Sequence, residues 1–156
     1  MEEYEYSFKV KSLKAYYEYC DNNGFTLVSD NNQTRDLYIG KENILARITK
    51  TSDNIILDFK HGDNSSEILH IRKESIPLEI NEKDLDAVLS IIDVLGYEQI
   101  EHLVRKRKVY EKDNVRFEID EYTEPEITNV VAIEGLKEEV DKVYESLKKV
   151  NEKEML

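Results

Sequence analysis

The chain has 156 residues, a length that fits one domain and lets the folded chain bury about two-thirds of its unfolded surface. Hydrophobic residues make up 40% of the sequence and charged residues 36%, which is more charge than an average globular protein carries. The net charge of −12 argues against non-specific binding to nucleic acid or to an anionic membrane, because both rest on positive charge.

The start of the sequence lacks the basic and apolar regions of a signal peptide, and no apolar stretch approaches the roughly 20 residues needed to span a bilayer. The single Cys20 cannot form an internal disulfide, and we expect it to be a small buried thiol. A soluble, cytoplasmic protein with a single domain over residues 1–156 is therefore predicted.

Most of the chain has the pattern of β-strands. In chain order, the expected strands are 2–10, 25–29, 33–40, 43–50, 54–61, 66–80, 97–112, 114–122 and 128–135. Asn31-Asn32 is a turn signal between the second and third of these. The stretch 66–80 is long for one strand, and Pro77 indicates a bend or a sheet edge within it.

Three segments have helical periodicity instead. Ser12 is a candidate N-cap for the first and Gly24 its candidate terminator, while Asn81 and Gly96 have the same places around the second. The third runs over about 136–147. Each segment has a single apolar stripe, so we expect each helix to lie outside a sheet and cover it.

A weak internal repeat relates the two halves of the chain. Five pairs of similar residues stand 72 positions apart: Leu13 and Leu85, Gly24 and Gly96, Phe25 and Tyr97, Arg35 and Arg107, and Tyr38 and Tyr110. This spacing indicates two related strand–helix–strand halves, which could close on each other as a barrel.

Nearly every predicted strand has one apolar face and one charged face, since side chains alternate with period two. In the first strand Glu3, Glu5, Ser7 and Lys9 share the charged face. The corresponding charged residues of later strands are Arg47, Asp58, Lys60, His70, Arg72, Glu74, Arg105, Arg107, Arg116, Glu118 and Asp120.

These charged faces have two interpretations. An antiparallel sheet with one solvated face is common. Alternatively, the helices cover the apolar faces from outside and the charges point inward. Removing one ion from water costs several kcal/mol, whereas a whole fold is worth about 5–15 kcal/mol, so such an interior must hold water and balanced charges. A divalent metal beside carboxylates and a polyanion beside cations would complete that balance.

The order of several motifs resembles the CYTH superfamily, also called triphosphate tunnel metalloenzymes. Glu3-x-Glu5 is similar to its opening Glu-x-Glu-x-Lys signature. Further similarities follow in order: Asp36-x-Tyr38, Leu45-Ala46-Arg47-Ile48 for Leu-Arg-Ile-Arg, Phe59-Lys60-x-Gly62, Arg72-x-Glu74, Leu95-Gly96-Tyr97, Arg105-x-Arg107-x-x-Tyr110, Asp120, and Ile133-Glu134-Gly135. The family includes class IV adenylate cyclases, thiamine triphosphatases and inorganic triphosphatases.

The resemblance implies an α+β fold in which eight antiparallel strands form a closed β-barrel, or tunnel, with helices packed outside. It implies that Mg²⁺ or Mn²⁺ is bound by Glu3, Glu5, Glu118, Asp120 and Glu134. It implies phosphate binding at Lys9, Arg47, Lys60, Arg72, Arg105, Arg107 and Arg116. The expected catalytic carboxylates are Glu5 and Asp120.

The chain departs from the family pattern at three positions. Ser7 stands where the signature has lysine, Ala132 replaces the first acid of the terminal Glu-x-Glu, and Thr49 replaces the second arginine of Leu-Arg-Ile-Arg. Lys9 lies on the same strand face as Ser7 and could reach the site in its place. These changes put turnover in question more than binding.

The first functional hypothesis is a metal-dependent hydrolase of a triphosphate compound, with inorganic tripolyphosphate, a nucleoside triphosphate or thiamine triphosphate as substrate. The alternatives are a class IV-like adenylate cyclase that makes cyclic AMP, a tunnel that binds nucleotide or polyphosphate as a sensor, and an unrelated domain with a solvated sheet. The expected partner is a small triphosphate or nucleotide, without nucleic acid or membrane. The chain is expected to be a monomer or a homodimer.

Overall fold

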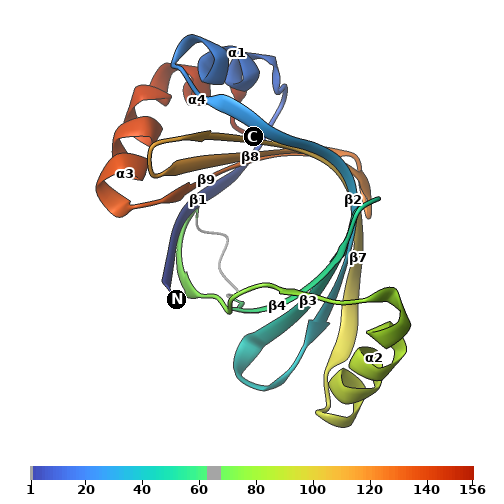
Figure 1. Cartoon of the computed structure of the whole chain (residues 1–156). Coiled ribbons are helices and arrows are strands. Elements are labelled where there is room, and N and C mark those ends of the chain that lie inside the picture. Colours follow the sequence, from blue (N-terminus) through green and yellow to red (C-terminus); the bar gives the residue numbers. More distant parts are fainter. Residues whose placement is uncertain (1, 63–67) are drawn as a thin grey trace.

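The computed structural model describes residues 2–62 and 68–156, and for residues 2 and 3 it describes the backbone alone. In this part of the chain, nine strands form one antiparallel sheet in the order β5-β1-β9-β8-β7-β2-β3-β4-β6, which curls into a rounded wall (Figure 1). The strands are β1 (Glu2–Val10), β2 (Thr26–Ile39), β3 (Ile44–Lys50), β4 (Ile55–His61), β5 (Leu69–Lys73), β6 (Leu78–Glu79), β7 (Glu98–Lys112), β8 (Val115–Glu124) and β9 (Thr128–Gly135).

The sheet curls but does not close, so the expectation of a closed eight-stranded barrel is wrong. Among the described residues, the end strands β5 and β6 do not pair with each other. The two-residue β6 pairs with β4, and one isolated bridge joins Lys60 to Glu74. Pro77, just before β6, has no N–H to give to a ladder. The described part of the expected strand 66–80 is therefore two short strands at opposite edges of the sheet.

β2 is one continuous strand, although two strands were expected on either side of Asn31-Asn32. Both asparagines stay in the β2–β7 ladder, where Asn31 pairs with Arg107 and Asn32 with Lys106. The long partner strand gives this segment backbone hydrogen bonds along its length, and these override the local preference for a turn.

The strand order is symmetrical about the central β7–β2 pair, which agrees with the repeat in the sequence. β8, β9 and β1 follow β7 on one side, where β5 is an additional edge strand, and β3, β4 and β6 follow β2 on the other. Gly24 and Gly96 end the first two helices with φ of +75° and +86°, a conformation that glycine adopts without strain. In both places the next amide donates to a carbonyl five residues back: Phe25 N to Cys20 O at 3.0 Å, and Tyr97 N to Ile92 O at 3.1 Å.

The helices are α1 (Lys14–Asn22), α2 (Leu85–Val94), α3 (Lys137–Ser146) and α4 (Lys148–Glu154), with short 3₁₀ turns η1 (Lys41–Asn43) and η2 (Glu82–Asp84). The three expected helices are confirmed, and α4 was not expected. Asn81 precedes η2 rather than an α-helix. Tyr16 of α1 donates its hydroxyl proton to Asn151 of α4 at 2.7 Å, which ties this extra helix to the others. In the described part of the chain, no helix is long and apolar enough to cross a lipid bilayer.

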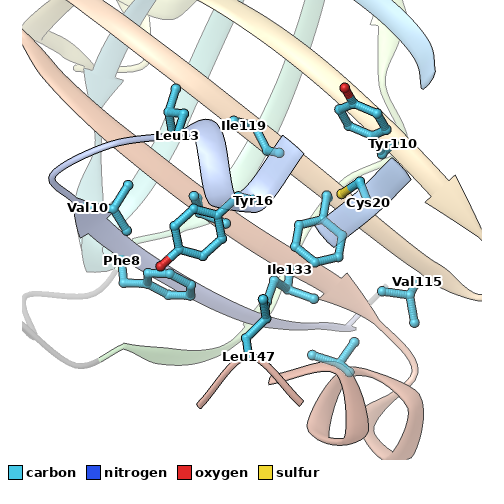
Figure 2. Packing of buried hydrophobic residues seen from close by; sticks show 13 residues of the cluster. Phe8, Val10, Leu13, Tyr16, Cys20, Tyr110, Val115, Ile119, Ile133 and Leu147 are labelled. Atoms are coloured by element: carbon cyan, nitrogen blue, oxygen red, sulfur yellow. The ribbon is translucent and has the colours of Figure 1, made fainter. Parts of the chain in front are cut away.

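The hydrophobic core lies on the outer side of the sheet, in two clusters. The larger cluster joins β1, β7, β8 and β9 to α1 and α3, and Figure 2 shows its close packing around Tyr16. Its buried members are Phe8, Val10, Leu13, Tyr16, Cys20, Tyr110, Val115, Phe117, Ile119, Val131, Ile133, Val140 and Leu147. In the smaller cluster Ile92 of α2 packs on Ala46 and Ile48 of β3. The helices therefore cover apolar strand faces, as predicted, and leave the charged faces on the inside of the curl.

Candidate functional site

The inside of the curled sheet contains a cavity of about 470 Å³. Small-molecule sites typically measure roughly 300–1,000 Å³, so this cavity has the volume of a small-molecule site. Asp53, between β3 and β4, lines it, as do nine further charged residues: Arg35, Arg47, Asp58, Lys60, Glu74, Arg107, Arg116, Glu118 and Glu134. These nine come from β2, β3, β4, β7, β8 and β9 and from the residue after β5, and the charged strand faces thus point into a space that can hold water.

Three carboxylates gather at one wall of this interior. Glu5 of β1 is the register partner of Glu134 on β9, and Glu118 on β8 is the partner of Ala132, two residues away from Glu134. Each of the three glutamates offers an oxygen within 4.8 Å of the others. We call Glu5, Glu118 and Glu134 the carboxylate trio. Three like charges at this spacing repel one another unless cations lie close by.

The trio has the chemistry of a site for a divalent cation. Mg²⁺ and Mn²⁺ prefer carboxylate and water oxygens, and the three side chains supply hard oxygen donors from three adjacent strands. Burial raises the pKa of Glu118, but Arg107 and Arg116 outweigh burial and lower that pKa to about 2. Glu118 is therefore ionised at neutral pH, as a metal ligand must be.

Arginines balance the trio in this structure. Arg72 Nη2 donates to Glu5 Oε1 at 3.2 Å, and Arg116 Nε lies 3.3 Å from Glu134 Oε1. Arg116 Nη2 also donates to Glu118 at 3.3 Å. Two predicted phosphate ligands, Arg72 and Arg116, thus contact predicted metal ligands directly.

The two remaining predicted metal ligands are placed differently. Glu3 is paired with Arg72 through the β1–β5 register, but its side chain lies outside the described residues. Asp120 is only 2% exposed and accepts two hydrogen bonds from Arg107, from Nε at 2.7 Å and from Nη2 at 2.8 Å. Arg105 Nη1 lies 3.9 Å from the same carboxylate. The expected catalytic pair is therefore divided: Glu5 belongs to the trio, and Asp120 holds an arginine.

Three of the predicted phosphate ligands, Lys9, Arg72 and Arg105, do not line this cavity among the described residues. Arg105 is 3% exposed and is held by Gln33, at 2.9 and 3.1 Å, and by the Tyr122 hydroxyl at 2.9 Å. The Lys9 side chain is 58% exposed and pairs with Glu126 at 3.5 Å. Lys9 lines a separate hollow of about 230 Å³ instead. Lys9 therefore does not reach into the cavity as a substitute for the signature lysine that Ser7 replaces.

The remaining predicted phosphate ligands, Arg47 and Lys60, are ion-paired at the wall opposite the trio's strands. Arg47 donates to both oxygens of Asp58, and its Nη2 donates to Glu74 at 3.0 Å. Lys60 Nζ lies 3.8 Å from the same glutamate. Burial lowers the pKa of Arg47, but the two carboxylates outweigh this and raise it. Arg47 therefore stays charged at neutral pH, and both side chains line the cavity.

Sequence reasoning missed Arg35 as a site residue. This half-buried side chain of β2 lines the cavity, and its Nε donates to Thr49 Oγ1 at 2.8 Å. Among the described residues, no carboxylate lies within ion-pair distance of it. Burial lowers the pKa of the Arg35 guanidinium, as do the positive charges of Arg105, Arg47 and Arg107. An arginine does not lose its proton in proteins, so this shift expresses the burial of the Arg35 guanidinium and the positive charge of the neighbouring arginines, which Glu118 only partly offsets.

A signal for Arg35 was present in the sequence. It is the repeat partner of Arg107, 72 residues later, and Arg107 was among the predicted phosphate ligands. Extending that prediction to the other half of the repeat would have identified it.

Comparisons of the whole structure show what this fold is similar to. It matches the PH1012 protein of Pyrococcus horikoshii with a TM-score of 0.71 at 16% identity, covering 96% of this chain and 88% of that one. It matches HpAC1 of Hippeastrum, a candidate adenylyl cyclase described as having a dominant triphosphatase activity, with a TM-score of 0.68 at 16% identity, covering 97% and 87%. It matches a candidate adenylate cyclase of Vibrio parahaemolyticus with a TM-score of 0.64 at 14% identity, covering 96% and 86%.

These identities are low, so the matches establish the fold. No family model matches the sequence, and no curated protein matches it either. The neighbours include proteins described as adenylate cyclases, and they extend over nearly the whole chain. The chain thus shares its fold with proteins described as adenylate cyclases, one of the activities found in the family that the motifs resemble.

Proposed function

We propose that this chain, with the fold of the CYTH superfamily, binds a triphosphate-bearing small molecule inside its curled sheet and hydrolyses it with the help of Mg²⁺ or Mn²⁺. One observation carries the proposal: a carboxylate trio and a set of guanidinium groups share the interior around a cavity of about 470 Å³. The charges of this cavity suit a ligand that consists of a polyanion with a bound cation.

The residues divide into two groups by the charge they offer. Glu5, Glu118 and Glu134 would hold the metal, which neutralises negative charge on the phosphate oxygens when it is bound. Arg35 and Arg107 face the same cavity and would contact the non-bridging oxygens directly. Phosphoryl transfer needs mainly positioning and charge neutralisation, and these groups can supply both.

Hydrolysis also needs an oriented water. Glu5 is the most buried member of the trio, at 6% exposure, and its carboxylate is suited to accept a hydrogen bond from that water. Attack of the water oxygen on the terminal phosphorus would form one P–O bond and break the bridging P–O bond; the bridging oxygen would leave with the bond's electron pair and the remaining phosphates, and the proton of the water would pass to the Glu5 carboxylate. Asp120 fixes Arg107 through two hydrogen bonds and thereby positions a cation for the leaving oxygens.

The two departures at Ser7 and Ala132 are compatible with turnover. Ser7 and Ala132 are register partners across β1 and β9. The chain therefore lacks a cation and an anion at two facing positions, so the net charge of the wall is the same as in the family pattern. This supports the exchange of a whole ion pair rather than the loss of a single catalytic group.

The test is phosphate release from tripolyphosphate, thiamine triphosphate and ATP, each with Mg²⁺ and with Mn²⁺, with cyclic AMP measured in the ATP samples. We expect phosphate release that depends on the metal, and its loss in Glu118→Gln. The matched control is Glu121→Gln, an exposed residue of the same strand outside the cavity lining, which should retain activity.

Other outcomes separate the alternatives. Cyclic AMP with pyrophosphate would replace the hydrolase by a cyclase. Binding of tripolyphosphate without any product would favour a sensor. Absence of both binding and products for all three compounds would contradict the proposal.

A further inference from the structure

Arg35 and Thr49 face each other across β2 and β3 as register partners. Thr49 Oγ1 accepts a hydrogen bond from Arg35 Nε at 2.8 Å. A hydroxyl can anchor the guanidinium at Nε without neutralising its charge. The two Nη groups make no hydrogen bond to a described residue, and the side chain lines the cavity.

The repeat provides a built-in comparison. Arg107, the partner of Arg35 in the other half, stands opposite Asp120 across β7 and β8. There, the carboxylate binds both Nε and Nη2, at 2.7 and 2.8 Å. Thr49 therefore has the place that Asp120 has in the second half. The equivalent arginines therefore differ: Arg107 is ion-paired with a carboxylate, whereas Arg35 is hydrogen-bonded to an uncharged hydroxyl.

The ion pairs of the interior also distinguish Arg35 from the other arginines. The chain has six arginines, and all six belong to the charged strand faces or line the cavity. Five lie within ion-pair distance of a described carboxylate: Arg47, Arg72, Arg105, Arg107 and Arg116. In the described part of the chain, Arg35 does not, and the positive charges of Arg105, Arg47 and Arg107 act on it, with Glu118 opposing them from beyond ion-pair distance. A half-buried cation without a carboxylate partner at a cavity wall attracts anions, so this place suits an anion from outside.

We propose that Arg35 is a phosphoryl-binding subsite, anchored by Thr49, that supplies from β2 the guanidinium missing at position 49 of β3. The inference rests on the proposed function for the identity of the anion, a polyphosphate. The two Nη groups form the flat fork that matches two oxygens of one phosphoryl group. Because positions 35 and 49 are opposite each other in the sheet, a guanidinium from either strand can reach the same part of the cavity.

The test measures the affinity for tripolyphosphate with Mn²⁺, at fixed salt, by calorimetry on the full chain. Loss of a charge-assisted hydrogen-bonded pair predicts binding weaker by roughly 10- to 100-fold in Arg35→Gln. Thr49→Asp keeps the arginine but gives it the carboxylate that Arg107 has. We expect a similar loss of affinity in Thr49→Asp, together with an unchanged or higher melting temperature.

The exchange variant Arg35→Thr/Thr49→Arg moves the guanidinium to the facing strand. It should bind at least tenfold more tightly than Arg35→Gln, because the charge returns to the same part of the cavity. Thermal unfolding and circular dichroism identify any variant that fails to fold, and Thr49→Asp retains the test if Arg35→Gln is one of them.

The outcomes distinguish this inference from the proposed function. Wild-type affinity in both Arg35→Gln and Thr49→Asp, with phosphate release intact, would overturn the subsite alone. Weakened binding in these variants without phosphate release by the wild type would support the subsite and overturn the hydrolase. A wild type that neither binds nor hydrolyses tripolyphosphate, thiamine triphosphate or ATP would overturn both.

Discussion

The isosteric change Asp120→Asn at the inner wall should destabilise the fold. The carboxylate is 2% exposed and receives two hydrogen bonds from Arg107, with Arg105 at 3.9 Å. An asparagine of the same shape turns an N–H₂ donor toward a guanidinium donor and removes the carboxylate that Arg105 and Arg107 share.

Breaking a buried ion pair costs about 3–5 kcal/mol. Glu118 still accepts a hydrogen bond from Arg107 Nη1 at 2.9 Å, which places the cost at the lower end, at about 3 kcal/mol. For a chain of this length, each kcal/mol lowers the melting temperature by about 2–4 °C, so the expected decrease is about 6–12 °C. Against a total stability of about 5–15 kcal/mol, the variant should still fold.

The assay is urea denaturation at pH 7 with thermal unfolding in parallel. Glu121→Gln, the next residue and exposed, is the control and should change the free energy of unfolding by less than about 0.5 kcal/mol. The variant Arg107→Met/Asp120→Leu removes both charges and should recover part of the loss, because a buried pair can be replaced by apolar groups at little cost. A decrease below about 1 kcal/mol in Asp120→Asn would show that Arg105 and Arg107 do not depend on this carboxylate.

Three further predictions concern acid stability, metal binding and the single thiol. The pKa of Glu118 is lowered to about 2, so its stabilising effect is complete above the ordinary glutamate range and is lost as the pH falls toward 2; Glu118→Gln should flatten the acid limb of stability measured by urea denaturation at pH 3–6, and an unchanged limb would contradict this. Mn²⁺ at 100 times its dissociation constant should stabilise the wild type by about 2.7 kcal/mol in thermal unfolding, and Glu134→Gln should lose most of that gain, whereas an equal gain in both would remove the trio as the metal site. Burial raises the pKa of Cys20 to about 12, so a thiol reagent should react with the native protein far more slowly than with the urea-unfolded chain; comparable rates would show that Cys20 is exposed.

The sequence predicted the alternation of faces well. Period-two alternation and single-striped helices depend on local chemistry, so the inward direction of Arg47 and Glu118 and the outer position of α1, α2 and α3 could be read without a structure. Closure of the sheet could not, because it depends on how the residues around Pro77 meet β4 at the far edge. Local turn preference at Asn31-Asn32 was also misleading, since a long neighbouring strand decided the outcome.

The site was predictable in composition and less so in arrangement. Glu5, Glu118 and Glu134 were all expected as metal ligands, and the structure brings their oxygens together. The roles of Asp120 and Arg35 depend on which residue stands opposite across a strand pair, a fact that only the register supplies. Motifs compare residues along the chain and not across a strand pair. They therefore showed Thr49 as a missing arginine and did not indicate Arg35, which stands opposite it.

The symmetrical strand order around β7 and β2 has a consequence for the orientation of a guest. Two identical halves would offer an elongated anion the same surroundings at both ends, and it could enter either way round. Here one half opposes its arginine with Asp120 and contributes two members of the acidic trio, while the other opposes the equivalent arginine with Thr49. A few side chains thus make the two ends of the cavity differ in charge, although the two halves of the fold are related. An elongated anion would therefore bind in one preferred orientation.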